Sequence, residues 1–409
     1  MPSKRMVEIV LLALTFSAGG ARSRAAHDGV PRLVPDDALD VVTWWNGHSL
    51  NPRSPDYQPE IDSPKPIIDV AAVHAEHPRS QTAGIEEALA MLPPAGGTLR
   101  LPKSHGPYVI TKAAANVPNR YRGNARIQIL RRSNVHFLSD GATLRGKAVL
   151  RISSQEFADH RTEDHPVRNF YFRGLVFDAD GDANVVSAEG VRDVVFDRCT
   201  FRNLGRETIN YGKGAVYCIS KSDNWWLRGC TFDGGERCWA FHPDGTHGSG
   251  MIGCRVSGDS QAAAMVFTND DVDRRRAEYL VFYRNTFCGS YRDAVIGMAA
   301  AKTLILENTV EGPVRYFVRS DGKQSAFGHT YTYYGNYILG NTLRDVQTIL
   351  RVQGALDLAT PYKIGKYTVK DNRVTGMQRA VFEEIRSDAG TVEGPNVVAN
   401  NGPDASTDR

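Results

Sequence analysis

Short runs of alternating apolar and polar residues recur along the chain, each built around a Cys or an Asn. The first clear copy is FDRCTF at 196–201 and the last is TVKDNRV at 368–374. The aligned position is occupied by Cys199, Cys230, Cys254, Asn285, Asn308, Asn341 and Asn372, at spacings of 31, 24, 31, 23, 33 and 31 residues. Repeats of this length indicate a solenoid. Because the runs are short and rich in Val, Ile, Phe and Thr, the pattern predicts strands and thus a parallel β-helix.

A second strand is predicted downstream of each Cys or Asn position. Its copies are AVYCIS at 215–220, CWAFH at 238–242, AMVFT at 264–268, AVIGM at 294–298, RYFVR at 315–319, ILRVQ at 349–353 and AVFEE at 380–384. In stacked coils these strands form one sheet, about 4.8 Å apart, with alternate side chains on the outside. The outer face of this second sheet is therefore the candidate binding surface.

Parallel coils with asparagines stacked at a tight turn resemble the pectate-lyase-like right-handed parallel β-helix superfamily. The resemblance covers roughly residues 84–400 and implies an all-β, single-stranded solenoid. The span from Thr98 to residue 400 is 303 residues, and at about 29 residues per coil it holds roughly ten coils. Because one fold carries many chemistries, the activity must be argued from the site.

An amphipathic helix is predicted just before the first coil. Ile85, Ala88, Leu89 and Leu92 fall on one helical face, and two prolines follow. The next strand is expected at 98–101. A solenoid exposes its core at each end, so this helix is expected to cap the N-terminal end.

The ends of the chain differ from the repeats. Lys4 and Arg5 precede an apolar run at 9–18 and then small residues, a pattern typical of a secretory signal. The proline-rich stretch that follows has no repeat, and its Trp44–Trp45 pair is expected to be a buried anchor. Export places the protein outside the cell or in the periplasm. The predicted organisation is a signal peptide at 1–26, an extended arm at 27–83, one β-helix domain at 84–400 and a disordered tail at 401–409.

Net charge and hydrophobicity limit which binding partners are expected. The net charge is only +3, which does not predict a nucleic-acid-binding face, and the apolar run near the N-terminus is too short to span a bilayer. Cys199, Cys230 and Cys254 share the position of the asparagines, so they are expected to stack inside the coil as small buried groups. Cys218 and Cys238 are the better candidates for a disulfide.

Polar residues gather at the ends of the second-sheet strands between 236 and 323. Ala264 and Gly297, in the strands themselves, are small and predict a trough floor. A trough of this kind suits a polymer that lies along it. The candidate catalytic residues are His242, Arg319 and Lys323, and the candidate substrate-binding residues are Asp244, His247, Tyr291, Arg292, Asp293, Arg315 and Arg351. Asp270 and Asp271 are candidate Ca²⁺ ligands, because Ca²⁺ prefers carboxylate oxygens.

This cluster favours a lyase that acts on an anionic, uronate-containing polysaccharide by β-elimination. A base removes the proton beside the uronate carboxylate, cations bind carboxylate groups, and an acid protonates the leaving oxygen. An imidazole exchanges protons near neutral pH, so His242 is the first candidate base. Lys323 or an arginine is the alternative, as the resemblance implies. Arg319 is expected three coils from His242, roughly 14 Å by coil spacing.

Three other functions remain open. Polygalacturonases of this fold are inverting hydrolases with NTD, DD, HG and RxK motifs. HPDG at 242–245 and TNDD at 268–271 resemble the first two, the third has no match, and VRSDGK at 318–323 resembles the last loosely. Sugar epimerases of this fold carry a DPHD motif, which HPDGTH matches only in composition. A non-catalytic carbohydrate-binding or surface solenoid predicts polar residues spread evenly over the coils.

Overall fold

The computed structural model describes most of the chain from residue 61 onward. The described residues are 61–112, 126–147, 149–154, 167–182, 184–205, 214–219, 222–235, 239–260, 262–266, 277–321, 332–333, 335–353, 362–365, 367–376, 380–385, 390–393, 397–399 and 402–403. The expected signal peptide and the Trp44–Trp45 pair lie outside them, so both stay predictions.

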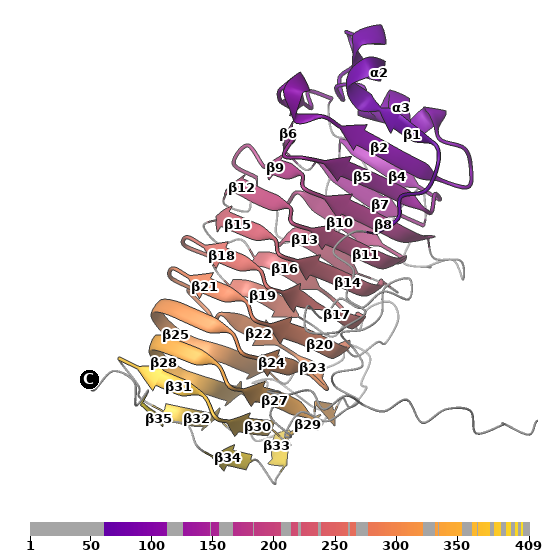
Figure 1. Ribbon diagram of the computed structural model, residues 1–409. Coiled ribbons are helices and arrows are strands. Elements are labelled where there is room, and N and C mark those ends of the chain that lie inside the picture. The colour runs from indigo at the N-terminus through magenta and orange to yellow at the C-terminus, as the bar shows by residue number, and fades with distance from the viewer. Residues whose placement is uncertain are drawn as a thin grey trace, which may run out of the picture. The chain divides into compact units, whose positions relative to one another are not determined.

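The described chain winds into a single-stranded, right-handed parallel β-helix (Figure 1). Sheet A holds the strands that precede the Cys and Asn positions, all paired in parallel. Its strands are β1 (Ile67–Asp69), β2 (Gly97–Leu101), β5 (Val135–Ser139), β8 (Val167–Arg173), β11 (Val191–Asp197), β14 (Asp223–Arg228), β17 (His247–Ile252), β20 (Ala277–Tyr283), β24 (Leu304–Leu306), β27 (Asn336–Leu339), β30 (Tyr367–Lys370) and β34 (Val397–Ala399), with β23 (Ala300–Ala301) beside β20.

Two further series of strands run along the helix and share a second sheet. Series B follows the Cys and Asn positions: β3 (Tyr108–Val109), β6 (Thr143–Arg145), β9 (Val176–Asp178), β12 (Thr200–Leu204), β15 (Thr231–Gly234), β18 (Arg255–Ser257), β21 (Thr286–Cys288), β31 (Arg373–Thr375) and β35 (Gly402–Pro403). Series C holds β4 (Ile127–Leu130), β7 (Leu150–Ser153), β10 (Val186–Glu189), β13 (Gly214–Ile219), β16 (Trp239–Pro243), β19 (Ala262–Val266), β22 (Ile296–Met298) and β32 (Ala380–Ile385). The long strands β25 (Thr309–Asp321) and β28 (Thr342–Gln353) run through both series. Series C is the second sheet predicted from the sequence.

A small third sheet lies near the C-terminal end. It consists of β26 (Thr332–Tyr333), β29 (Tyr362–Gly365) and β33 (Gly390–Glu393), paired in parallel.

The turn from sheet A to series B explains the recurring Cys and Asn. The residue before each such position has a left-handed backbone, for example Arg284 with φ of 54°. Asn308 Nδ2 donates to the carbonyl of Phe282 on the preceding coil at 2.9 Å and to Asn341 Oδ1 at 3.0 Å, and its own Oδ1 accepts from Asn285 N at 2.9 Å. The predicted asparagine ladder is confirmed.

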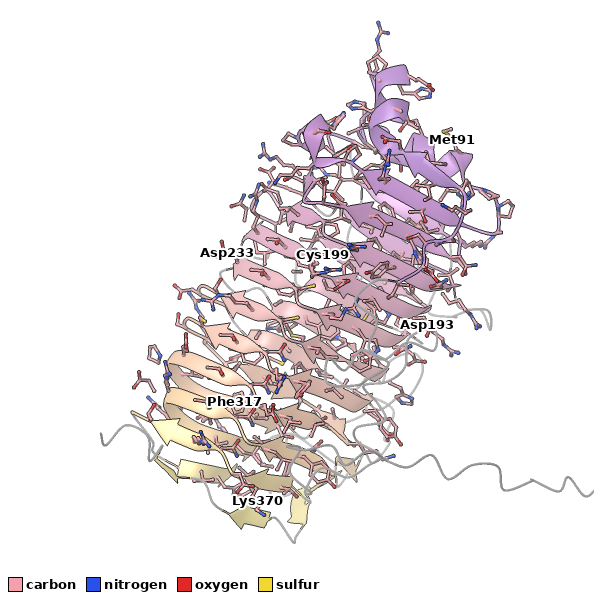
Figure 2. All side chains as sticks on the ribbon, in the orientation of Figure 1. Met91, Asp193, Cys199, Asp233, Phe317 and Lys370 are labelled. Carbon is pink, nitrogen blue, oxygen red and sulfur yellow. The ribbon has the colours of Figure 1, made fainter. Side chains whose placement is uncertain are left out.

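The cysteines take the place of asparagine in the earlier coils. Cys230 Sγ donates to the Phe196 carbonyl at 3.2 Å, and Cys254 Sγ donates to the Leu227 carbonyl at 3.2 Å. Each acceptor lies three residues before the Cys of the preceding coil, which is the position that Asn308 uses. Cys199 lies within the coil (Figure 2), and all three are buried and unbridged, as predicted.

The register of Cys218 bears on its expected disulfide with Cys238. Cys218 is buried with a free thiol and pairs with Pro243 on the next coil. Cys238 lies outside the described residues, but its neighbour Trp239 pairs with Gly214, four positions before Cys218. A bridge needs closely opposed Cα atoms, so the register does not support this pairing.

The ladder gives a testable stability difference. Replacing Asn308 by Ala leaves the buried Asn285 amide and the Phe282 carbonyl without their partner. Thermal or urea unfolding should show a loss of roughly 1–3 kcal/mol. Asn308→Cys should lose less than Asn308→Ala, because the Cys254 and Cys230 thiols make the equivalent bond two and three coils earlier. Full stability with lost turnover in Asn308→Ala would contradict the scaffolding role.

The N-terminal cap is close to the predicted one. Helix α3 (Ile85–Met91) buries Ile85, Ala88 and Leu89 against the first coil, and β2 follows it. The segment expected as an extended arm is partly regular, since it contains β1 and helix α2 (Val70–Glu76), which Asp69 caps. A short 3₁₀ helix, η2 (Lys103–His105), completes this end.

The paired strands of the β-helix extend slightly past residue 400, the expected end of the domain. β35 pairs with β31 through Gly402 and Pro403, two residues of the segment expected to be a tail. Residues 404–409 lie outside the described part. No helix among the described residues is long and apolar enough to cross a membrane.

Candidate functional site

One row of side chains, one per coil, runs along the outer face of series C. Phe241, Ala264 and Ile296 stack in register inside the core, so the next residue on each strand points away from the core. The register continues from Gly297 to Arg319 and Arg351. We call this set the outer row; it consists of Tyr217, His242, Met265, Gly297, Arg319 and Arg351.

His242 is held by a carboxylate at the end of its strand. Pro243 ends β16, and Gly245, with φ of 59°, turns the chain so that Asp244 Oδ1 lies 2.8 Å from His242 Nε2. The imidazole is 5% exposed and Asp244 is 16% exposed. A carboxylate in this position fixes the ring orientation and stabilises the imidazolium. The contact therefore places a carboxylate against Nε2 and leaves Nδ1 as the ring nitrogen for proton transfer, and both nitrogens are buried.

Aromatic rings enclose the imidazole. Trp239 stands edge-on to His242 with centroids 4.4 Å apart, and the Tyr217 ring of the preceding coil lies at 4.7 Å. Trp239 also packs with Ala262 and Met265 in a cluster separate from the main core. These contacts bury His242, which as a whole residue is 4% exposed.

Arginines occupy the outer row beyond the apolar coils. Arg319 lies three coils from His242, as the spacing predicted, and its Nη1 is 3.4 Å from Asp293 Oδ1. Arg351 follows on the next coil and donates through Nη1 to the Tyr316 hydroxyl at 2.7 Å. The row thus joins a proton acceptor and a pair of guanidinium groups on one face.

The predicted trough floor is wrong in one respect. Gly297 pairs with Met265, whereas Ala264 pairs with Ile296 and belongs to the core. A Cβ placed on Gly297 would lie 2.5 Å from Met265 Sδ. The Met265 side chain therefore covers Gly297. Met265 is itself only 1% exposed, so the middle of the outer row between His242 and Arg319 is buried rather than an open floor.

Two other expected site residues belong to the scaffold. Tyr291 is 4% exposed, and its hydroxyl donates to the Val256 carbonyl at 3.1 Å. Burial raises the pKa of Tyr291 well above its usual range, so it is not placed to meet a substrate. His247 begins β17 on sheet A, where its amide donates to Asp223 Oδ1 at 3.0 Å, and so it does not share the outer row.

Of the remaining expected site residues, some lie among the described residues and others do not. Arg292 is exposed beside Asp293, and Arg315 is exposed beside Tyr316. Lys323, Asp270 and Asp271 lie outside the described residues. Within the described residues no group of three or more His, Cys, Asp or Glu could hold a metal ion, so the Ca²⁺ site stays a prediction.

Sequence reasoning missed three residues in or near the outer row. Tyr217, a member of the row, and Trp239 were treated only as strand residues, although both contact His242. Arg151 was also missed: it is 2% exposed and lies 3.8 Å from Glu189 on the next coil. The signal was available, because an Arg inside the apolar run LRIS at 150–153 marks a charged side chain on a half-buried strand.

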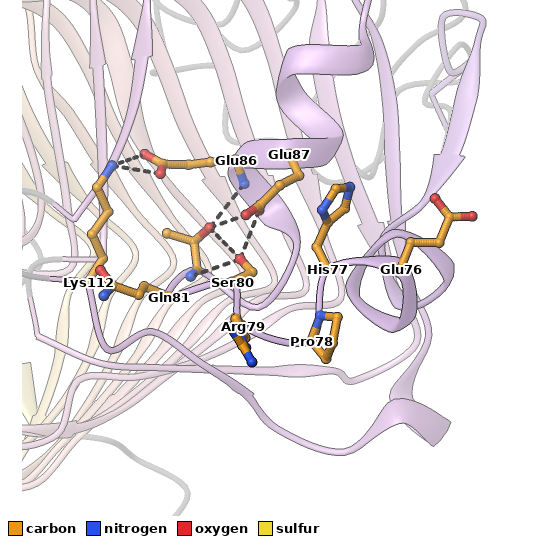
Figure 3. Close-up of a pocket in the computed structure, with 10 residues that line it drawn as sticks. Glu76, His77, Pro78, Arg79, Ser80, Gln81, Glu86, Glu87 and Lys112 are labelled. Atoms are coloured by element: carbon orange, nitrogen blue, oxygen red, sulfur yellow. Dashed lines mark hydrogen bonds and ion pairs between the residues drawn. The ribbon is translucent and has the colours of Figure 1, made fainter.

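A cavity at the N-terminal cap is a separate feature (Figure 3). It has about 620 Å³ and is lined by residues 76–82 with Glu86, Glu87 and Lys112. Lys112 Nζ lies 2.5 and 2.6 Å from the two oxygens of Glu86, and Ser80 donates to Glu87 at 2.8 Å. Since these polar groups satisfy one another, the cavity is explained by the capping structure.

Comparisons with known proteins match the fold and not a sequence family. No protein-family model and no curated protein sequence matches the chain. An exopolygalacturonase from Thermotoga maritima is similar in structure, with a TM-score of 0.57 at 11% identity over 83% of this chain and 94% of the other. Two more similar structures have lower scores: ORF18 of Geobacillus virus E2 (TM-score 0.45, 11% identity, 82% and 61% covered) and the A-module of the Azotobacter vinelandii mannuronan C-5 epimerase AlgE6 (0.43, 16%, 79% and 92%). The chain therefore has a right-handed parallel β-helix fold.

Proposed function

We propose that this protein is a polysaccharide-active enzyme, and specifically a lyase that cleaves an acidic, uronate-containing polysaccharide by β-elimination. The observation that carries the proposal is the outer row, in which the His242–Asp244 pair lies in line with Arg319 and Arg351. In the proposal a chain of acidic sugars lies along series C, with the partly exposed Arg319 and Arg351 towards one end and the buried His242 towards the other. The similarity to an exopolygalacturonase supports only the fold, so the activity is argued from this chain's residues.

In the proposed reaction His242 is the base. Its imidazole takes the proton on the carbon beside the uronate carboxylate, the electrons of that C–H bond form a carbon–carbon double bond, and the bond to the glycosidic oxygen breaks. The leaving oxygen gains a proton from an acid. Tyr217, whose ring lies 4.7 Å from the imidazole, is the proposed acid. Asp244 stabilises the imidazolium that forms.

The arginines act on the chain rather than on the reacting carbon. Arg319 stands three coils from His242, roughly 14 Å by coil spacing, which is too far to neutralise the carboxylate of the reacting sugar. Its guanidinium instead suits the carboxylate of a sugar unit further along the polymer. The expectation that Arg319 belongs to the chemical step is therefore replaced by a binding role.

An inverting hydrolase is less well supported. It requires two carboxyl groups about 6.5–9.5 Å apart. Asp244 follows β16 and Asp293 precedes β22, so six strand positions, roughly 20 Å, separate their backbones. Each also faces a basic partner, His242 or Arg319. By strand position Glu236 and Asp293 are another possible carboxyl pair, two coils apart, but Glu236 lies outside the described residues.

A screen on uronate polymers tests the proposed reaction. Only β-elimination creates the unsaturated sugar that absorbs near 235 nm, so we expect that absorbance to rise as polygalacturonate, alginate or glucuronan is cleaved. New reducing ends without this absorbance would overturn the lyase and support a hydrolase. Neither signal on any acidic polymer would favour a binding protein.

A further inference from the structure

A second cationic cluster joins the strand of Arg319 to the next coil. Arg351 leans back over the preceding coil, where its Nη1 donates to the Tyr316 hydroxyl at 2.7 Å and its guanidinium carbon lies 4.8 Å from the ring centre. The guanidinium carbon of Arg315 lies 4.9 Å from the same ring centre. Arg315, Tyr316 and Arg351 together form what we name the Tyr316 cluster.

Tyr316 is a rigid support for this cluster. It is 4% exposed, and its strand is paired on both sides, with β22 and with β28. A guanidinium that both stacks on a fixed ring and donates to its hydroxyl keeps one orientation. The remaining donors of Arg351 are therefore held in place before any ligand arrives.

The Tyr316 cluster has no carboxylate partner among the described side chains. Arg319 has Asp293 beside it, whereas no carboxylate among the described side chains pairs with Arg315 or Arg351. Arg351 Nε is buried and has no hydrogen-bond partner among those side chains. In register Arg351 lies between Arg319 and Glu383, so one neighbouring strand carries a like charge and the other an opposite charge. A carboxylate bound here would accept from the guanidinium fork.

We propose that the Tyr316 cluster is a subsite for the carboxylate of an acidic sugar unit on the chain that reacts at His242. The inference rests on the proposed function for the identity of that chain. Arg351 lies four coils from His242, roughly 19 Å, so the unit held here is a distant one. The subsite should therefore make binding depend on the length of the acidic chain.

Calorimetric titration of the full-length protein can measure this directly. The probes are dimers and hexamers of galacturonate, mannuronate, guluronate and glucuronate, and the methyl-esterified galacturonate hexamer. Titrations use His242→Asn, so that the probes are not cleaved. Adding Arg351→Gln should weaken binding of the preferred acidic hexamer by about tenfold or more. Dimer binding should not change, and the esterified hexamer should bind weakly to both forms. Tyr316→Phe, which keeps the ring and loses the hydroxyl, should give a smaller loss.

Arg344→Gln is the matched control. Arg344 lies on the same strand, has a 59% exposed side chain and faces Glu311, so its loss should leave hexamer binding unchanged. Equal losses in Arg344→Gln and Arg351→Gln, equal affinity of Arg351→Gln and its parent, or no binding of any acidic hexamer would each overturn the subsite.

The two proposals fail separately. Binding that depends on Arg351 without any unsaturated product would keep the subsite and overturn the lyase. Unsaturated product from the unmodified protein, together with unchanged hexamer binding and KM in Arg351→Gln, would keep the lyase and overturn the subsite.

Discussion

Replacing His242 by Asn is expected to lower turnover of a uronate polymer by about 100-fold or more, the usual contribution of a positioned general base. Asn keeps a polar side chain among Trp239 and Tyr217 while it removes the group that accepts the proton. Asp244→Asn should lower turnover by about tenfold or more, because the ring loses its orienting carboxylate. Initial rates at 235 nm, with thermal midpoints for each variant, check both effects.

His77→Asn is the control for this experiment. His77 is exposed on the N-terminal cap beside the cavity of Figure 3, far along the sequence from the outer row, and its loss should not change turnover. If His242→Asn kept near-parent turnover, His242 would not be the base. Lys323, the next candidate from the sequence, would then be tested in the same way.

Asp197→Ala is expected to destabilise the protein by about 3–5 kcal/mol, the range found when one partner of a buried ion pair is removed. Asp197 is 2% exposed on sheet A and binds Arg228 through two contacts, Nε to Oδ1 at 3.0 Å and Nη2 to Oδ2 at 2.7 Å. The Tyr171 hydroxyl donates to the same carboxylate at 2.6 Å. The substitution therefore strips a buried guanidinium of its carboxylate. Chemical unfolding measures the loss.

Asp233→Ala provides the comparison. Asp233 is an exposed residue of series B, labelled at the edge of the coils in Figure 2, so its removal should change stability by no more than about 0.5 kcal/mol. Equal unfolding midpoints for the two variants would contradict the scaffolding role of Asp197. The turnover of folded Asp197→Ala should stay near that of the parent, because this network lies on a different sheet from the outer row.

The solenoid was predictable because two independent signals repeat in step. Period-two alternation gives strands, and the recurring Cys or Asn marks the turn where a side chain must bond the backbone of the coil before it. The count of coils between His242 and Arg319 was correct for the same reason, since parallel stacking converts sequence order into distance. The order of the coils along the β-helix axis can therefore be predicted from this sequence.

Which face a small residue occupies was not predictable. The strand AAAMV at 262–266 is apolar throughout, so the alternation of apolar and polar residues does not show which side chains face the core. A shift of one residue exchanges the inner and outer faces. Ala264 was placed outside for this reason, whereas the register puts Met265 there. The contact between Arg351 and Tyr316 joins residues 35 positions apart through the lean of a long side chain, which no local pattern encodes.

The most direct test of the central claim is a crystal structure of the His242→Asn variant with a bound acidic hexasaccharide. The account predicts a chain that runs along the outer face of series C, with a sugar unit at residue 242 and carboxylates at Arg319 and Arg351. A saccharide bound instead on sheet A or in the N-terminal cavity would contradict the assignment of the outer row as the active face.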